Sequence, residues 1–288
     1  MIVDLRSSQG GLTVYSEDEQ LTETVKYKLT GLDNWYSSPP IRITIDEIPD
    51  HDGAFNPVRS YRGSKPMALN GFVYAPTAQQ AIADGWKMVA AVAPFGEPLT
   101  LTVTDDDGVL TQRVWLSGAP AVVPFARSKA RFQIPITAMD PRKYGLQQTI
   151  STGPVGSSGD GMIWPLFAAG YLDFGTFSPS GLFYLTNTGT AESWPVFTAL
   201  GTLTDGFRVT SEGDTLTYAA TVPLGTLLTL SPYAGGRATV GSSDLTVNLS
   251  QTAWPSVKPG QTRAFSFAGL GLSDANALIT AFMSPASW

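Results

Sequence analysis

The chain has 288 residues, of which 43% are hydrophobic and 15% charged, and its 24 acidic and 18 basic residues leave a net charge of −6. A charged fraction below the usual value of about a quarter excludes a solvated charged coil and predicts packed cores. Cysteine is absent and histidine occurs once, at His51, so disulfide scaffolds, thiolate nucleophiles and cysteine-based metal centres are excluded.

The acidic balance gives no electrostatic reason to bind nucleic acid or an anionic membrane, so we expect no specific nucleic-acid partner. No run of 18 apolar residues is present, so we expect no membrane span. The N-terminal sequence MIVDLRSSQGG lacks the pattern of a secretory signal peptide.

The two halves of the chain differ in composition. Residues 1–150 hold 30 of the charged residues and 11 glycines, whereas residues 151–288 hold 12 and 18. Between them, residues 151–161 contain four glycines and one large apolar residue, which is typical of a flexible connector. We therefore predict an N-terminal domain at residues 1–150, a Gly/Ser linker at 151–161 and a C-terminal domain at 162–288.

The first half is predicted to be mostly strands with one helix. Residues 41–45 alternate Ile-Arg-Ile-Thr-Ile, which is the period of a half-buried strand. A helix is expected to begin after Thr77 as the N-cap, with an apolar face at Ile82, Trp86, Val89 and Ala93, and to end at Pro94.

Three further runs favour strands. Residues 99–103 and 109–116 flank the turn sequence Asp-Asp-Asp-Gly and predict a hairpin. Residues 132–136 predict another strand, and Pro135 favours an edge position because it lacks a backbone donor.

The second half predicts an antiparallel sandwich or barrel, because short strand-like runs alternate with Gly, Asp, Asn or Pro turns. The expected strands lie at residues 183–186, 196–200, 207–210, 216–222, 226–230, 238–240, 245–249, 263–267 and 278–282. The last range also fits a short helix near residues 273–282.

Two acidic segments could in principle hold a cation. His51 lies in a loop with Asp46, Glu47, Asp50 and Asp52, but these residues lack a fixed ligand spacing, which favours a structural loop over a metal or acid–base site. The acidic run at residues 105–107 lacks the spacing of an EF-hand, which favours a turn. We therefore predict no metal ligands and no cofactor.

Catalytic motifs are also missing from the sequence. There is no G-x-S-x-G elbow and no phosphate-binding glycine loop. A glycosidase needs only two carboxylates, and no pair stands out here. We therefore predict no catalytic residues and no enzyme activity. Exposed tryptophans would favour sugar binding, but Trp194, Trp254 and Trp288 are interpreted as core or strand-end anchors.

Several segments together resemble the distal tail proteins of long-tailed bacteriophages, which are also called minor tail proteins. The segments are residues 32–35, 52–55 and 62–71, the helix at 77–93, residues 136–144 with the sequence Asp-Pro-Arg-Lys-Tyr, and residues 163–167, 187–191 with Pro195, and 254–260. The most specific are the D-P-R-x-Y ending at 140–144 and the turn from Trp254 to Pro259-Gly260, where glycine supplies the positive φ of a type II turn.

The resemblance implies a mainly β protein with two domains: an N-terminal β-structure with one packed helix, and a C-terminal galectin-like antiparallel β-sandwich. It implies a structural protein at the tail tip of the virion, assembled in the cytoplasm of the host bacterium. Six copies would form a ring that joins the tail-tube protein to the tail-tip hub protein, with the tape measure protein as a further implied contact. The alternative is a carbohydrate- or receptor-binding module of the tail tip.

Overall fold

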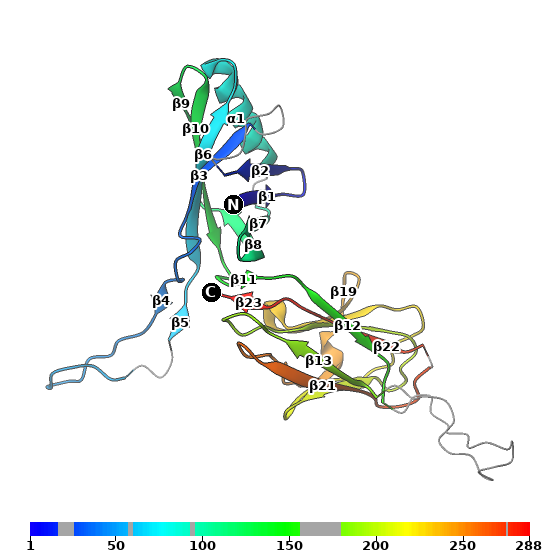
Figure 1. Cartoon of the computed structure of the whole chain (residues 1–288). Helices are drawn as coiled ribbons and strands as arrows, with labels where there is room; N and C mark the ends of the chain where they lie inside the picture. Colours follow the sequence, from blue (N-terminus) through cyan, green and yellow to red (C-terminus); the bar gives the residue numbers. More distant parts are fainter. Residues whose placement is uncertain (17–25, 57–59, 93–95, 156–179, 275) are drawn as a thin grey trace, which may run out of the picture. The chain divides into compact units, whose positions relative to one another are not determined.

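The computed structural model describes residues 1–16, 26–56, 60–92, 96–155, 180–274 and 276–288. The chain forms two compact units, Met1–Gly145 with Trp288, and Leu146–Ser287 (Figure 1). Strand β12 (Gln148–Thr152) pairs with β22 (Leu278–Met283) inside the second unit, and Ile150 packs on its core. The predicted boundary is therefore late, because residues 148–152 form a strand of the second unit and belong neither to the first domain nor to a linker. Residues 156–161 of the predicted linker lie outside the described residues.

The first unit is a β-structure with one helix, as the sequence predicts. Its strands are β1 (Ile2–Arg6), β2 (Gly11–Tyr15), β3 (Tyr27–Asp33), β4 (Ile41–Arg42), β5 (Tyr61–Arg62), β6 (Lys65–Tyr74), β7 (Leu99–Asp105), β8 (Gly108–Leu116), β9 (Ala121–Ala126), β10 (Lys129–Ala138) and β11 (Lys143–Tyr144).

Most of these strands form one sheet that closes into a barrel. The order is β11-β8-β7-β1-β2-β3-β6-β10-β9, and β8 also pairs with β10, which closes the ring of strands. Alternate side chains of the strands point inward, as in β1, where Val3 and Leu5 are fully buried. The closed barrel leaves β9 as a strand with one partner, at the end of the sheet.

The helix α1 (Ala78–Val92) begins where the sequence predicts, because the Thr77 hydroxyl accepts a hydrogen bond from the Gln80 amide. Its buried face differs from the prediction. The buried residues are Ala81, Gly85, Met88, Val89 and Val92, whereas Trp86 is 49% exposed. The predicted end of the helix at residues 93 and 94 lies outside the described residues.

Gly85 explains the rotation of the helix. A Cβ at this position would lie 2.6 Å from a methyl carbon of Val122 on β9, so the missing side chain lets α1 approach the strand closely. Apolar periodicity gives no weight to glycine, which has no side chain. It therefore assigns the neighbouring Trp86 to the buried face, whereas the structure buries Gly85.

We expect Gly85→Ala to destabilise the first unit although alanine is the better helix former. Val122 is β-branched and stiff, so the added methyl should lower the free energy of unfolding by about 1–3 kcal/mol. Thermal unfolding of the full chain measures this change. The double variant Gly85→Ala/Val122→Ala should recover part of the loss, and an unchanged or raised Tm in the single variant would contradict the packing argument.

The predicted hairpin is confirmed. Strands β7 and β8 pair antiparallel from Leu99 opposite Val114 to Asp105 opposite Gly108. The predicted edge position of residues 132–136 is wrong, because β10 is paired on both sides. Pro135 is tolerated because its nitrogen faces the break between β9 and β8, where the Ser117 amide donates to the Pro135 carbonyl.

The predicted half-buried strand at residues 41–45 is wrong. Only Ile41 and Arg42 form a strand, β4, which pairs with β5 alone. Ile41, Ile43 and Ile45 are 64%, 48% and 65% exposed. Apolar and polar residues do alternate at residues 41–45. The chain leaves the barrel at Pro39 and Pro40, however, so no core lies against either face of this segment.

The second unit consists of two antiparallel sheets. Besides β12 and β22, the strands of these sheets are β13 (Leu182–Thr186), β14 (Val196–Leu200), β15 (Phe207–Ser211), β16 (Asp214–Tyr218), β17 (Leu228–Ser231), β18 (Arg237–Val240), β19 (Ser243–Asp244), β20 (Leu249–Thr252) and β21 (Thr262–Gly269), with 3₁₀ turns at Tyr233–Gly235 and Thr246–Asn248. The short strand β23 (Ala286–Ser287) belongs to neither sheet.

One sheet has the order β12-β22-β14-β17-β18-β19 and the other β13-β21-β15-β16-β20. Phe183, Phe197, Phe207, Phe265 and Phe267 lie buried in a core that side chains of both sheets share. The mainly β, antiparallel fold of this half is therefore confirmed. Two local predictions are wrong: residues 246–248 form a 3₁₀ turn, and residues 278–283 are a strand, which excludes the short helix near 273–282.

Candidate interaction surfaces

The single histidine lies in an exposed turn. His51 and its acidic neighbours Asp50 and Asp52 are exposed, and the Ile48 amide donates to the Gly53 carbonyl, which closes the loop. Within the described residues, no group of three or more His, Asp or Glu side chains is arranged to hold a metal ion. The hydrogen bond from Ile48 to Gly53 makes this segment a closed, exposed turn.

The acidic run at residues 105–107 is the turn of the β7–β8 hairpin. The Asp107 amide donates to the Asp105 carboxylate, and the Tyr36 hydroxyl donates to the same carboxylate at 3.0 Å. Partial burial and this hydrogen bond raise the pKa of Tyr36. Asp105 therefore ties the end of β3 to the hairpin, which is a structural role.

The three tryptophans that were candidates for sugar binding, Trp194, Trp254 and Trp288, are all partly buried. Trp254 packs against the core of the second unit, and its indole lies where a side chain of Gly236 would be. This position supports the interpretation of Trp254 as an anchor. Its replacement would therefore report on folding as much as on ligand binding.

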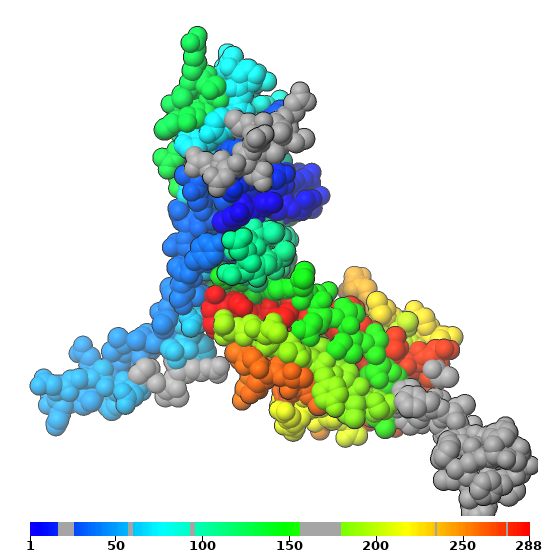
Figure 2. All heavy atoms as spheres, viewed as in Figure 1, coloured from blue at the N-terminus to red at the C-terminus, as the bar shows by residue number. Residues whose placement is uncertain are grey.

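The most exposed apolar segment of the first unit is an arm, defined here as residues 37–56 and 60–62. It carries Ile41, Ile43, Ile45 and Phe55, each about half to two thirds exposed. Its two legs are joined by the short β4–β5 pairing and by a bridge between Glu47 and Ala54. In Figure 2 the arm stands clear of the barrel strands.

The root of the arm is held by a buried lysine. Lys65 is 1% exposed, and its ammonium donates to the carbonyls of Trp35 at 2.9 Å and Ser37 at 2.7 Å. Lys143 donates to the same Trp35 carbonyl at 3.1 Å and lies over the indole ring of Trp35. Neither lysine forms an ion pair within the described part of the chain.

Two ammonium groups therefore share one carbonyl inside the protein. Burial and the charge of Lys143 lower the pKa of Lys65 to about 8. Burial also lowers the pKa of Lys143, although the charge of Asp105 opposes this effect. The two lysines connect the starts of β6 and β11 to the segment that follows β3, at the base of the arm. No sequence motif indicates this lysine pair.

The D-P-R-x-Y segment is a small hydrogen-bonded cluster. Asp140 accepts from the Arg142 guanidinium at 2.8 Å and from the Tyr144 hydroxyl at 2.6 Å. Burial raises the pKa of Asp140, but the hydrogen bonds from Arg142 and Tyr144 outweigh it and leave the pKa below its ordinary value. Arg142 and Tyr144 thus tie the end of the first unit through Asp140.

We expect Asp140→Asn to lower the free energy of unfolding by about 1–2 kcal/mol at neutral pH, because hydrogen bonds to a charged acceptor are lost. A carboxylate with a lowered pKa stabilises the fold above its unfolded pKa, and the contribution disappears as pH falls through the folded pKa. Urea unfolding should therefore show a difference between variant and parent that shrinks in acid below about pH 4. Asp52→Asn, at an exposed aspartate beside His51, is the control and should change little.

Asn187 connects the two motifs of the second unit. It is fully buried, and its amide donates to the carbonyls of Ala191 at 2.7 Å and Val257 at 2.9 Å, while its oxygen accepts from the amides of Gly189 and Ala286. Gly260 has the positive φ of 69° that the predicted type II turn requires, and its amide donates to the Asn187 carbonyl. The segments 187–191 and 254–260 therefore form one structural unit. The segment 163–167 lies outside the described residues.

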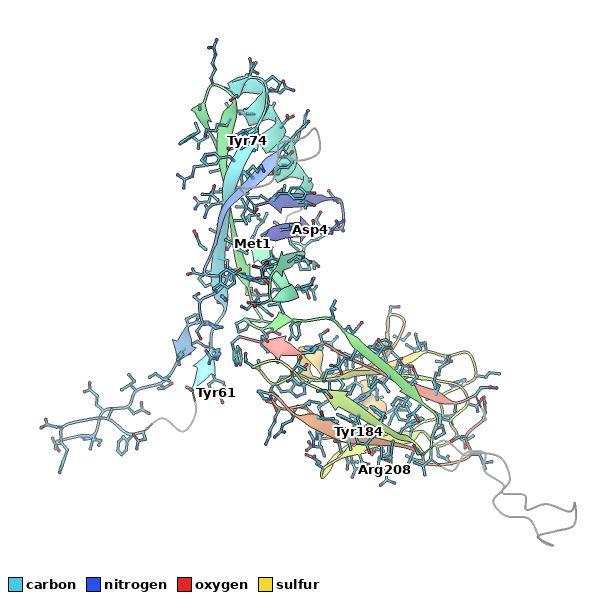
Figure 3. All side chains as sticks on the ribbon, in the orientation of Figure 1. Met1, Asp4, Tyr61, Tyr74, Tyr184 and Arg208 are labelled. Atoms are coloured by element: carbon cyan, nitrogen blue, oxygen red, sulfur yellow. The ribbon has the colours of Figure 1, made fainter. Side chains whose placement is uncertain are left out.

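A second exposed surface lies on the far end of the barrel. Phe72 and Tyr74 at the end of β6, Val123 and Phe125 on β9, and Lys129 and Arg131 on β10 share the face opposite α1, and we call these residues the aromatic–basic patch. Phe125 and Val123 are more than half exposed. Figure 3 labels Tyr74 on β6 and Tyr61 on β5, in the returning leg of the arm.

The described fold is that of a two-part, mainly β protein whose exposed features are an arm and an unpartnered sheet face. Among the described residues, no helix has the length and hydropathy needed to cross a bilayer.

Solved structures similar to this one include a phage Dit protein and chains of a phage baseplate. The Dit (gp 19.1) protein of phage SPP1, described as a paradigm of the hub adsorption apparatus in phages that infect Gram-positive hosts, is 12% identical, with a TM-score of 0.62 over 98% of each chain. Chains of the phage P2 baseplate in its activated conformation, with Ca or with Sr, are 8% and 9% identical with TM-scores of 0.48 and 0.47. No protein-family model and no curated protein matches the sequence.

The likeness to SPP1 Dit extends over nearly the whole of both chains. It therefore includes both units and is not limited to the β-sandwich, which is a common fold. The resemblance to distal tail proteins that the sequence suggests is thereby confirmed at the level of the fold.

Proposed function

We propose that this chain is a structural protein of the phage tail tip, in which six copies form a ring between the tail tube and the hub. The observation that carries the proposal is the shared fold with SPP1 Dit over 98% of both chains. The protein would act without catalysis or a cofactor, since its contacts with the tail-tube protein, the hub protein and the tape measure protein would be its function. Its place would be the virion, after assembly in the host cytoplasm.

The arm and the aromatic–basic patch support a role in assembly. Large apolar side chains in clusters on a monomer mark surfaces that other chains cover. Closure of a ring needs a heterologous contact, in which one surface of a copy binds a different surface of its neighbour. The first unit offers two such different surfaces on one chain.

Two measurements test the proposal. Light scattering of the purified chain, alone and mixed with the tail-tube and hub proteins, should give a species of about six times the chain mass, and electron microscopy should show rings. Gold-labelled antibodies against the chain should decorate the tail tip of intact virions. A chain that stays monomeric with both partners, and labels no tail tip, would contradict the proposal.

Sugar or receptor binding by the second unit is the second candidate. Tyr184 on β13 is 57% exposed, and Arg208 on β15 is exposed on the same outer sheet face, because their partners on β21 are Ala264 and Ala268 (Figure 3). An exposed aromatic ring can stack on the apolar face of a saccharide, and an exposed guanidinium on the same sheet face can donate hydrogen bonds to its hydroxyls. A glycan array that shows binding lost in Tyr184→Ala, with ring assembly intact, would favour this function.

A further inference from the structure

The arm has a composition unlike that of a solvent loop. Its outer part combines Ile43, Ile45 and Phe55 with the acidic residues Asp46, Glu47, Asp50 and Asp52. All of these side chains are exposed. Within residues 42–56 of the described chain four acidic side chains stand against the cations Arg42 and His51, and Arg62 lies at the root of the arm. An isolated two-stranded hairpin is marginally stable in water, so this segment gains stability when a surface covers its apolar side chains.

The arm is nevertheless held in place at its root. The Gly63 amide donates to the Pro40 carbonyl at 2.7 Å, and the Arg62 guanidinium donates to the Ser38 hydroxyl at 2.6 Å. Lys65 holds the Ser37 carbonyl from inside the barrel. A fixed root presents the apolar side chains in a set direction, which reduces the entropy lost when the arm binds.

The aromatic–basic patch has the opposite charge. The Lys129 ammonium lies 4.9 Å from the ring centre of Phe72 and 5.0 Å from that of Phe125. Arg131, two residues after Lys129 on β10, is also exposed. It lies opposite Phe72 of β6 on one side and opposite Val123 of β9 on the other. No acidic side chain belongs to this face on β9 or on the paired part of β10.

The patch also contains a hollow. Ala121, Val123, Pro124, Phe125, Arg131 and Gln133 line a cavity of 340 Å³ on β9 and β10. The cavity is large enough for a phenyl or branched aliphatic side chain, and it has Arg131 at its wall. Its chemistry therefore matches an apolar side chain flanked by carboxylates, which is the pattern around Phe55.

The two surfaces lie at opposite ends of β6. The arm joins β6 at Lys65, and Tyr74 of the patch ends it, which separates the two by about 30 Å along an extended strand. The arm leads away from the barrel at its end (Figure 1). A chain with complementary surfaces at its two ends binds its own copies head to tail, so a second copy of this chain is the matching occupant.

We infer that the arm of one copy docks on the aromatic–basic patch of the next, with Phe55 and Ile45 on the apolar side chains and the acidic residues against Lys129 and Arg131. This inference rests on the proposed function, because it names the contact that would close the ring. It assigns the apolar stripe of residues 41–45 to an interface instead of a core.

Two full-length variants test the inference. Phe55→Asp disables the arm and leaves the patch intact, whereas Arg131→Glu disables the patch and leaves the arm intact. Each should weaken self-association about 100-fold or more and appear monomeric by light scattering. Both positions are exposed, so circular dichroism should show an unchanged fold.

The mixture of the two variants is the decisive measurement. The intact arm of the Arg131→Glu chain should bind the intact patch of the Phe55→Asp chain, and the remaining pair of surfaces is disabled on both sides. Native mass spectrometry should therefore show a 1:1 heterodimer and nothing larger. Two controls with the same charge change on other exposed positions, Leu272→Asp and Lys87→Glu, should assemble like the parent.

The possible outcomes separate this inference from the proposed function. If the parent forms rings and either variant does so too, the arm–patch contact is wrong and the ring stands. If the parent labels the tail tip but never self-associates, the inference is overturned and the tail location stands. If the parent neither self-associates nor occurs in the tail, both are wrong.

Discussion

Replacing Asn187 with alanine is expected to destabilise the second unit more than any other single polar substitution in it. The side chain is 0% exposed and takes part in hydrogen bonds to Ala191, Val257, Gly189 and Ala286. Truncation leaves buried carbonyl and amide groups without a partner, and each such group costs about 1–3 kcal/mol. The expected loss is about 3–5 kcal/mol, which is a large part of the stability of a domain of this size.

Calorimetry and hydrogen exchange of the full chain measure the effect separately for the two units. The transition of the second unit should move down by roughly 10 °C or more. Amide protection in β13 and β21 should fall while that in the barrel strands remains unchanged. Asn248→Ala, which removes one half-buried hydrogen bond to the Tyr218 hydroxyl, is the matched control and should have a small effect. Equal effects of the two variants would contradict the assigned role of Asn187.

The second large effect concerns Lys65. Because of this lysine, the free energy of unfolding of the first unit is expected to rise with pH. The pKa of this lysine is lowered from 10.5 to about 8. Between these values the unfolded chain keeps the proton and the folded chain does not, so the unfolded state binds more protons and stability rises with pH. Below about pH 8 both states are charged, and the fold bears the full penalty of the buried ammonium.

The expected gain across this window is on the order of 3 kcal/mol, from about 1.4 kcal/mol per pH unit. Urea unfolding from pH 7 to 10.5 should show it in the parent chain and show a flat profile in Lys65→Met, after subtraction of other titrating groups. Lys87→Met, at an exposed ammonium on α1, should follow the parent. A variant profile that still rises like the parent would exclude Lys65 as the source.

Part of the fold follows from local chemistry and was predictable. The β7–β8 hairpin depends on Asp106 and Asp107 in a tight turn before Gly108, and α1 begins at Thr77 because its hydroxyl caps the first free amides. The Pro259-Gly260 turn likewise depends on glycine at a positive φ. In these cases neighbouring residues alone determine the conformation.

The candidate surfaces were less accessible to sequence reasoning. Residues 41–45 have the period of a half-buried strand, yet nothing in that pattern says whether a core or a second chain covers the apolar face. The aromatic–basic patch combines residues from β6, β9 and β10, and only the strand register brings Phe72, Val123 and Arg131 into one row. Lys65 and Lys143 meet at Trp35 across 78 residues of chain, so neither is part of a readable motif.

Composition, turn chemistry and alternation therefore established a mainly β chain without cysteine and with two parts of different composition, because these properties depend on residue types and their nearest neighbours. The tertiary structure decided which apolar faces are inside, where the units divide and which charges are buried, because burial depends on segments far apart in the chain. Gly85, Pro135 and Ile43 show this most clearly. Each of these residues has the local conformational preference that its type predicts. Whether the residue is buried, paired or exposed depends on which distant segment packs against it.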